Sequence, residues 1–241
     1  MRYIVMHKVD AMMEAGTPPD HELVKSMGQL VGESLKKGIF VDGAGLHRSA
    51  RRVRLRCIAG SCDVEHGPYQ GENELVASMA LIRTDSIDAA VEQAQRFGVA
   101  LGDAEIEIGP VVEAWDLTGS SKPDDVKGEQ FLLLFKGDPN DERGQEIAPE
   151  RADAVAHLDD ELASKGILLK RHRIAPSSTG KRLAGPEGNR TWTDGPFTES
   201  KEMIAGFSIL EVPSLADAIT WADRYAAILI DNEIDVRRMA D

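Results

Sequence analysis

The sequence of 241 residues resembles itself when it is shifted by 128 positions. The alignment needs no gap and keeps one register over a whole domain length. Internal repeats constrain a fold before other features do, because every copy must form the same supersecondary unit. The identical residues that the shift superposes include Lys8 and Lys136, Glu74 and Glu202, Arg54 and Arg182, and Gly67-Pro68 and Gly195-Pro196. We therefore predict two copies of one domain, joined head to tail.

The boundary between the copies is predicted from a short polar segment. Residues 118–128 are rich in Gly, Ser, Lys, Pro and Asp, a composition that is typical of linkers. The sequence therefore predicts one domain over residues 1–117, a linker over 118–128 and a second domain over 129–241.

Each copy shows the pattern β-α-β-hairpin-β-α-β. Apolar runs at residues 3–6 and 131–135 predict the first strands. The first helices are predicted to end at Gly38 and Gly166, and Ser86 and Ser214 are predicted to cap the second helices. This order is typical of a ferredoxin-like α+β fold.

A ferredoxin-like sheet covers only one of its faces with helices, so its other apolar face needs a partner. A tandem copy supplies that partner. We therefore expect two α+β repeats packed sheet to sheet as an intrachain pseudo-dimer, with a cavity between the sheets. The sequence leaves open whether two such chains form a homodimer.

The charge balance excludes some partners. Lys and Arg number 28 against 41 Asp and Glu, which gives a net charge of −13. This charge disfavours nucleic acid and anionic membrane surfaces. No apolar run approaches the ~20 residues of a membrane helix, and residues 1–6 do not resemble a signal peptide. We expect a cytoplasmic protein.

Two cysteines, Cys57 and Cys62, lie in one short segment. We expect them to be reduced thiols on either side of a tight turn. A zinc site of Cys57, Cys62, Asp63 and His66 is the alternative, but a C-x4-C pair lacks the usual spacing and a second pair. With no phosphate-binding loop in the sequence either, we expect neither a metal nor a cofactor.

The second copy contains TWTDGPFTESKE at residues 191–202, followed by the apolar strand sequence of residues 203–212. This phrase resembles the YCII-related domain, in the branch named for its Asp-Gly-Pro-Phe motif, and the resemblance covers most of residues 129–240. In the first copy the motif has drifted to HGPYQGE at residues 66–72.

The resemblance implies a dimeric α/β barrel. It also implies that some relatives are enzymes with a His-Asp pair, and that many proteins of this branch occur beside extracytoplasmic-function sigma factors. Met27 and Val155 stand near the place of the relatives' helix histidine, so the sequence departs from the family pattern there.

Asp194 in the motif is the first catalytic candidate, as a general base at a cavity rim. The alternative is turn chemistry, because Asp side chains bind backbone amides beside a Gly-Pro bend. His66 replaces Asp194 in the first copy and is the second catalytic candidate, since an imidazole titrates near neutral pH. The alternative for His66 is decay of a spare site.

The candidate ligand-binding residues are Arg54, Arg182, Glu199, Lys201 and His7. The arginines match between the copies and could clamp a carboxylate, or they could be surface residues of a hairpin. Glu199 and Lys201 could contact a polar substrate or form a solvated loop. His7 could point into the cavity or into the core.

Two functions remain open. The first is binding or conversion of a small polar or oxygenated molecule by proton transfer, with Asp194 as the base and Arg182 orienting the ligand. The second is a non-catalytic accessory module with a sigma factor as its protein partner.

Overall fold

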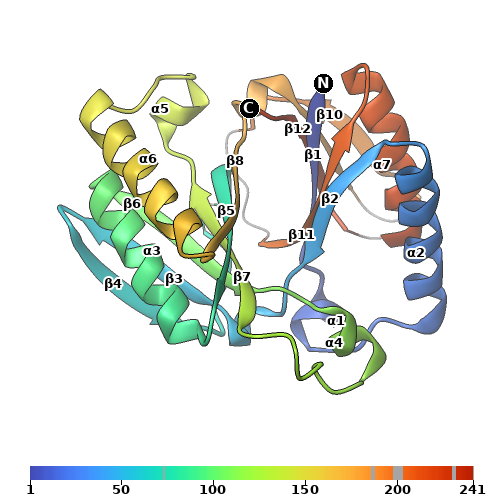
Figure 1. The fold of residues 1–241 in the computed structure, drawn as a ribbon. Coiled ribbons are helices and arrows are strands. Elements are labelled where there is room, and N and C mark those ends of the chain that lie inside the picture. The colour runs from blue at the N-terminus through green and yellow to red at the C-terminus, as the bar shows by residue number, and fades with distance from the viewer. Residues whose placement is uncertain (73, 186–187, 198–202, 230–231, 241) are drawn as a thin grey trace.

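The computed structural model describes residues 1–72, 74–185, 188–197, 203–229 and 232–240 (Figure 1). The helices are α1 (Ala11–Glu14), α2 (His21–Lys36), α3 (Ile87–Leu101), α4 (Ala114–Thr118), α5 (Pro139–Glu142), α6 (Pro149–Ser164), α7 (Leu215–Leu229) and the 3-10 turns η1 (Ser49–Arg51) and η2 (Ser177–Thr179). The strands are β1 (Arg2–Lys8), β2 (Phe40–Gly45), β3 (Val53–Ile58), β4 (Ser61–His66), β5 (Val76–Thr84), β6 (Ala104–Pro110), β7 (Glu129–Lys136), β8 (Leu168–Arg173), β9 (Lys181–Ala184), β10 (Thr191–Asp194), β11 (Ile204–Glu211) and β12 (Ile234–Arg238).

The strands form two antiparallel sheets of six. Sheet I has the order β10-β9-β12-β1-β11-β2, and sheet II has the order β4-β3-β6-β7-β5-β8. At every position of the two orders the strand numbers differ by six, so that β10 corresponds to β4, β1 to β7 and β2 to β8. The α+β class is therefore confirmed, and the strand arrangement is compatible with a ferredoxin-like fold.

Each sheet takes strands from both halves of the chain. Sheet I joins β1 and β2 of the first half to β9–β12 of the second, and sheet II joins β7 and β8 to β3–β6. The expectation that each copy builds its own sheet is therefore wrong, because the opening β-α-β units have exchanged places. In Figure 1 the blue β1 accordingly lies among the orange and red strands.

The exchange follows from where the chain goes after β2 and β8. Beyond β2 the chain crosses to sheet II, where Leu46 forms a bridge with Val111, and beyond β8 it crosses to sheet I, where Ile174 forms a bridge with Met239. These two bridges are related by the 128-residue shift. They tie the edge strand of each sheet to the other sheet at two corners of the molecule.

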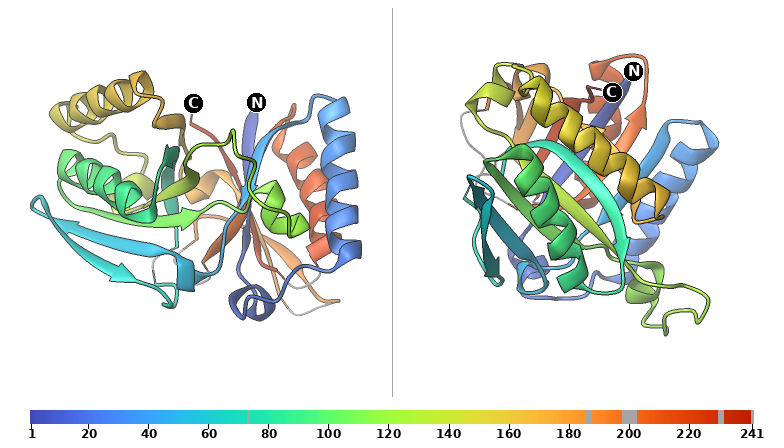
Figure 2. Two further views of the ribbon diagram at one scale, coloured as in Figure 1. Left: turned by 60° about the horizontal axis from the view of Figure 1, so that its bottom comes forward. Right: turned by 60° about the vertical axis from the view of Figure 1, so that its left-hand side comes forward.

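Three apolar clusters divide the core into layers. One lies between sheet II and the helices α3 and α6, and a second lies between sheet I and the helices α2 and α7. The third contains Ile4, Met6, Leu132, Leu134 and Phe207, so both sheets contribute to it. Two views show the resulting order of helices, sheet, sheet and helices (Figure 1, Figure 2).

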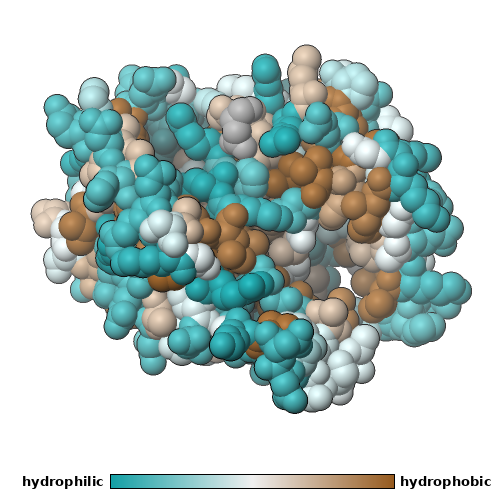
Figure 3. All heavy atoms as spheres, in the orientation of Figure 1, coloured by the Kyte–Doolittle hydropathy of each residue, from teal (hydrophilic) through white to brown (hydrophobic). Residues whose placement is uncertain are grey.

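The helix ends follow the local sequence. Asp20 accepts a 2.7 Å hydrogen bond from Leu23 N at the start of α2, and Ser86 accepts one of 3.2 Å from Ala89 N at the start of α3. Gly38 and Gly166 end α2 and α6 with φ of +68° and +70°, which favours glycine. Hydrophilic residues cover the outward faces of α2 and α6 (Figure 3). Among the described residues, no helix is both long and apolar enough to cross a membrane.

The cysteine expectation is wrong, because Cys57 and Cys62 form a disulfide. The two residues lie directly opposite each other in the β3-β4 hairpin, which brings their side chains together. The disulfide packs on Gly98 of α3, where an added Cβ would lie 2.3 Å from Cys57 Sγ. Within the described ranges no cluster of acidic, His or Cys side chains could hold a metal ion.

Replacing both cysteines with alanine tests the contribution of this disulfide. Because the disulfide closes a loop of only a few residues, we expect the free energy of unfolding to fall by about 2 kcal/mol. Urea titrations with and without a reductant measure the change. The reductant should have no effect on the double variant, and an equal midpoint for the reduced and oxidised native chain would contradict the prediction.

A fragment of residues 129–241 tests the exchange. In the intact chain, β7, α6 and β8 of this fragment lie on sheet II and cannot complete sheet I. We therefore expect the isolated fragment to dimerise by a reciprocal exchange, as measured by light scattering after gel filtration. Adding residues 1–117 should convert it into a one-to-one complex, whereas a cooperatively folding monomer would refute the idea.

Candidate functional site

The Gly-Pro motifs hold the two hairpins against the 3-10 turns. A Cβ on Gly67 would lie 1.8 Å from Ser49 O, and one on Gly195 would lie 1.9 Å from Ser177 O, so only glycine fits at either position. Phe197 N donates a 2.9 Å hydrogen bond to Ser177 Oγ. These contacts give the Gly-Pro-Phe part of the motif a structural role.

Asp194 lies at the end of β10, where its side chain is 79% exposed and pairs with Lys181 at 2.6 Å. In the β9-β10 ladder, Asp194 lies opposite Lys181 while Thr193 lies opposite Arg182. Successive side chains of a strand point to opposite faces, so Asp194 and Arg182 face opposite sides of the hairpin. The expectation that these two residues form one site is wrong. A catalytic role for Asp194 stays a prediction that this geometry does not support.

His66 has the same placement in the first half. It is exposed, and it lies opposite Val53, a residue of the helix-facing core, whereas Glu65 lies opposite Arg54. His66 therefore faces away from Arg54, as Asp194 does from Arg182. Its catalytic role also stays a prediction.

His7 points into the core between sheet I and its helices, which settles the two directions left open by the sequence. Its Nδ1 lies 2.8 Å from the Tyr225 hydroxyl, and burial lowers the pKa of His7 to about 4. The equivalent pair in sheet II is Phe97 and Phe135, which makes a similar edge-to-face contact. His7 is therefore a neutral core residue. Glu199 and Lys201 lie outside the described residues.

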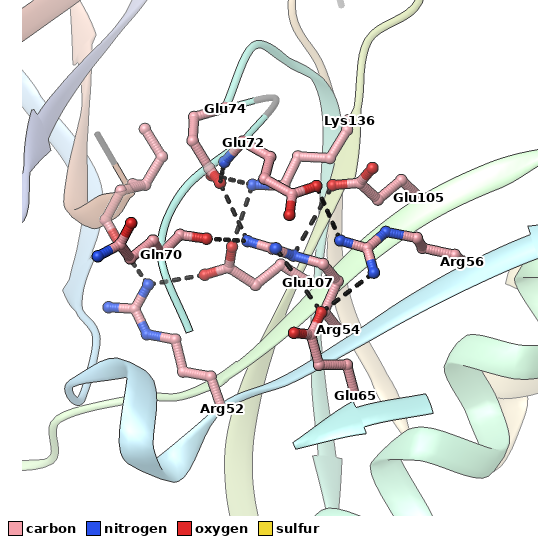
Figure 4. A network of polar contacts seen from close by, with 11 residues as sticks. Arg52, Arg54, Arg56, Glu65, Gln70, Glu72, Glu74, Glu105, Glu107 and Lys136 are labelled. Atoms are coloured by element: carbon pink, nitrogen blue, oxygen red, sulfur yellow. Dashed lines mark hydrogen bonds and ion pairs between the residues drawn. The ribbon is translucent and has the colours of Figure 1, made fainter. Parts of the chain in front are cut away.

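Arg54 lies in a buried group of charged side chains on the inner face of sheet II, the face that is turned toward sheet I. We call this group cluster 1, and it consists of Arg52, Arg54, Glu74, Glu107 and Lys136 (Figure 4). Every side chain in it is at most 8% exposed. Strand alternation places it there, because the neighbours of these residues on β3, β6 and β7 face the helix-side core.

The ion pairs in cluster 1 are continuous. Glu107 accepts from Arg52 Nη1 at 2.7 Å and from Lys136 Nζ at 3.1 Å. Lys136 also pairs with Glu74, which accepts from Arg54 Nη2 at 3.3 Å. Burial alone would raise the pKa of Glu107, but Lys136 and Arg52 outweigh it and hold that pKa at about 2. The buried carboxylate is therefore ionised and is a poor base.

A second group, cluster 2, occupies the equivalent place on sheet I and consists of Lys8, Arg182, Asp235 and Arg237. Asp235 pairs with Lys8 at 3.2 Å and accepts from Arg182 at 2.6 Å and 2.9 Å. Arg182 stacks on Phe197 at 4.3 Å, as Arg54 stacks on Tyr69 at 4.2 Å. The two arginines that the sequence singled out, Arg54 and Arg182, thus lie in two related clusters.

Arg52 binds the backbone of sheet I and of the segment that follows β2. Its Nε donates to His47 O at 2.6 Å, and its Nη1 donates to Ile204 O of sheet I at 2.8 Å. Residue 180 stands at the equivalent position of the second half and is a glycine, so cluster 2 has no arginine from that position.

Arg237 supplies the missing guanidinium from a different strand. Its Nε donates to Ala175 O at 3.0 Å and its Nη1 to Val76 O at 2.8 Å. Positions 175 and 76 correspond to 47 and 204 under the 128-residue shift. Arg237 lies over Gly180, just as Arg52 lies over Gly109. Arg52 and Arg237 therefore make equivalent contacts in the two clusters, although they stand at different positions of the repeat.

Cluster 1 contains buried donors without a hydrogen-bond partner, whereas the corresponding guanidinium nitrogen in cluster 2 is hydrogen-bonded. The buried atoms without a hydrogen-bond partner include Arg52 Nη2, Arg54 Nε, Arg54 Nη1, the Tyr69 hydroxyl and Glu105 Oε1. In cluster 2, Arg237 Nη2 donates to Ala175 O and lies 3.3 Å from Glu142 Oε1. Since buried polar groups are usually paired, cluster 1 is the better candidate for a ligand site.

Glu105 lies at the partly open edge of cluster 1. It shares the inner face of β6 with Glu107, its side chain is 21% exposed, and its Oε1 lies 3.8 Å from Arg54 Nε. Burial raises the pKa of Glu105, although Lys136 and Arg54 act in the opposite direction. It is the one carboxylate beside cluster 1, within the described part of the chain, that combines solvent access with a raised pKa.

Arg52, Glu74, Glu107 and Lys136 were not predicted from the sequence. Lys136 gave a signal, because it directly follows the apolar run FLLLF, and a charged residue that continues a buried strand must be paired. Glu107 gave none, because it takes a polar position in the regular alternation of residues 104–108, which is typical of a strand with one solvated face.

Glu107→Gln tests the charge balance of cluster 1. The substitution leaves Lys136 and Arg52 partly uncompensated, so we expect a loss of about 3 kcal/mol in the free energy of unfolding at neutral pH. The pKa of Glu107 is lower in the folded chain than its ordinary value of 4.5, so its contribution is present above pH 4.5 and is lost as the pH falls toward 2. Urea titrations between pH 7 and pH 2 measure both effects. A variant as stable and as acid-sensitive as the native chain would contradict the assignment.

One comparison with known proteins gives a match. The family model of the YCII-related domain matches residues 130–237, which is less than half of the chain. Neither the curated proteins nor the solved structures include a match. The matched segment contributes β7 and β8 to sheet II and β9–β12 to sheet I, so the part of the chain that resembles this family is divided between the two sheets.

Proposed function

We propose that the protein is a tandem form of the YCII-related domain, in which the two sheets form an α/β barrel within one chain. It binds a small oxygenated organic molecule at cluster 1 and exchanges a proton with it through Glu105. The equivalent strand orders and the two corner bridges support the duplicated barrel. The raised pKa of Glu105, beside buried donors without partners, carries the functional proposal.

Glu105 suits proton transfer better than the other carboxylates near it. A general base works best with a pKa close to the working pH, and burial moves the pKa of Glu105 in that direction. Glu107 is fully buried and held at a pKa of about 2 by two cations. Asp194 is exposed, pairs with Lys181 and faces away from Arg182. Lactones, hydroxyquinones and small organic acids are substrates with acidic C–H or O–H groups that such a base could serve.

The test is a turnover screen of the full chain against these three classes of compound. For an active compound, we expect Glu105→Gln to lower kcat by a factor of about 10² to 10⁴. Glu233→Gln is the matched control, because Glu233 is the equivalent residue on sheet I and pairs with Arg182 at 3.2 Å. The control should keep its turnover. Loss of turnover in Asp194→Asn, with Glu105→Gln active, would instead restore the motif carboxylate as the base.

An accessory role beside a sigma factor remains the second candidate. A groove of about 630 Å³ between α3 and α6 is lined by Glu92, Arg96, Val99, His157 and Glu161 and offers a surface of mixed charge to a protein. Pull-down of a sigma factor encoded beside this protein, repeated with Val99→Asp, would support this role if the substitution abolished binding.

The cytoplasmic location also stays a prediction. The Cys57–Cys62 disulfide argues against it, because disulfides are uncommon in that compartment.

A further inference from the structure

We infer that cluster 1 binds one small carboxylate per chain, which accepts hydrogen bonds from Arg52 Nη2 and the Tyr69 hydroxyl. This inference rests on the proposed function for the place of the site and adds the class of ligand. It also makes the two sheets functionally unequal, because cluster 2 has neither free donor.

Both donors are buried and without a partner. Arg52 is 1% exposed and uses Nε and Nη1 for His47 O, Ile204 O and Glu107, which leaves Nη2 unused. The Tyr69 ring lies under the Arg54 guanidinium at 4.2 Å, and its buried hydroxyl is also unused. A buried donor without an acceptor destabilises the folded chain, so an incoming oxygen that accepts its hydrogen bond would recover that loss.

The charge of cluster 1 favours an anion over a neutral acceptor. The edge carboxylates Glu65 and Glu105 both pair with Arg54, at 3.8 Å. Among the described residues, Arg52 instead pairs with Glu107 alone, and it shares that carboxylate with Lys136. The Arg52 guanidinium therefore keeps positive charge that an incoming carboxylate can compensate. A guanidinium N–H and a hydroxyl are suitable donors for the oxygens of a carboxylate.

Cluster 2 shows why the second site is absent. Phe197 stands where Tyr69 stands in cluster 1 and has no hydroxyl. Glu14 and its counterpart Glu142 each accept hydrogen bonds from the serine of the neighbouring 3-10 turn. Only Glu142 also accepts from a guanidinium, that of Arg237, whose Nη2 donates to Ala175 O as well. On sheet I the Arg237 guanidinium therefore has no Nη2 donor left for a ligand, whereas on sheet II the Arg52 guanidinium has one.

The experiment is a calorimetric titration of the full chain with acetate and benzoate, and with the uncharged acetamide and benzamide as matched probes. We expect a carboxylate to bind with a stoichiometry of one per chain and at least tenfold more tightly than its amide. Equal binding of acid and amide would mean that water or any neutral acceptor satisfies the donors, and it would overturn the inference. Two equivalent sites per chain would do so as well.

Two variants assign the site. Tyr69→Phe reproduces the residue of cluster 2, keeps the ring beneath Arg54 and removes only the hydroxyl. It should weaken carboxylate binding about fivefold to tenfold without lowering the stability of the free chain, because the lost hydroxyl had no partner. Tyr3→Phe removes a hydroxyl from the helix-facing core of sheet I and should bind as the native chain does. Unchanged affinity in Tyr69→Phe would remove the site from cluster 1.

Carboxylate binding at cluster 1 and proton transfer by Glu105 can be refuted independently. Carboxylate binding that requires the Tyr69 hydroxyl, together with full turnover in Glu105→Gln, would leave the ligand site standing without the proton-transfer role. Turnover that requires Glu105, without any preference for carboxylates over amides, would leave the catalytic proposal standing and refute the ligand class.

Discussion

The structure depends on the mutual burial of the two inner sheet faces. Helices cover the outer face of each sheet, so Ile4, Met6, Leu132 and Leu134 on the inner faces leave water only if the other sheet covers them. Burial of apolar surface contributes about 25 cal/mol per Å², and an uncovered sheet face would lose that contribution. We therefore expect neither sheet to be stable by itself, and the bridges at Leu46 and Ile174 join the two sheets at their corners.

The same burial restricts which charged side chains the inner faces can hold. A charged side chain in this layer is tolerated only when it is paired and hydrogen-bonded. Arg52 and Arg237 show the strength of that constraint, because they start from different strands and still bind equivalent backbone carbonyls. Each sheet thus has a guanidinium at this point, and a glycine stands at the position from which the other sheet supplies it.

The sequence predicted elements and caps well because their signals are local. Ser86 and Ser214 cap helices, and Gly38 and Gly166 end them, through contacts within a few residues. The exchange of β-α-β units could not be predicted in this way, because β1 and β7 are both apolar runs, and such a run does not specify which sheet it joins. The disulfide was missed for a related reason, since it depends on Cys57 and Cys62 lying directly opposite each other in the hairpin register. Asp194 and His66 drew attention because they lie in the motif, but the motif glycines serve the packing of the hairpins against η1 and η2.

The exchange also places residues of both halves of the chain in each cluster. Cluster 1 combines Arg54 and Glu107 of the first half with Lys136 of the second, and cluster 2 combines Arg182 and Asp235 of the second half with Lys8 of the first. Each half thus supplies the lysine of one cluster and the arginine and carboxylate of the other. A change in the hairpin of one half, such as tyrosine against phenylalanine at positions 69 and 197, alters one cluster alone. Each lysine neutralises a carboxylate of the other half, which it meets only because of the exchange.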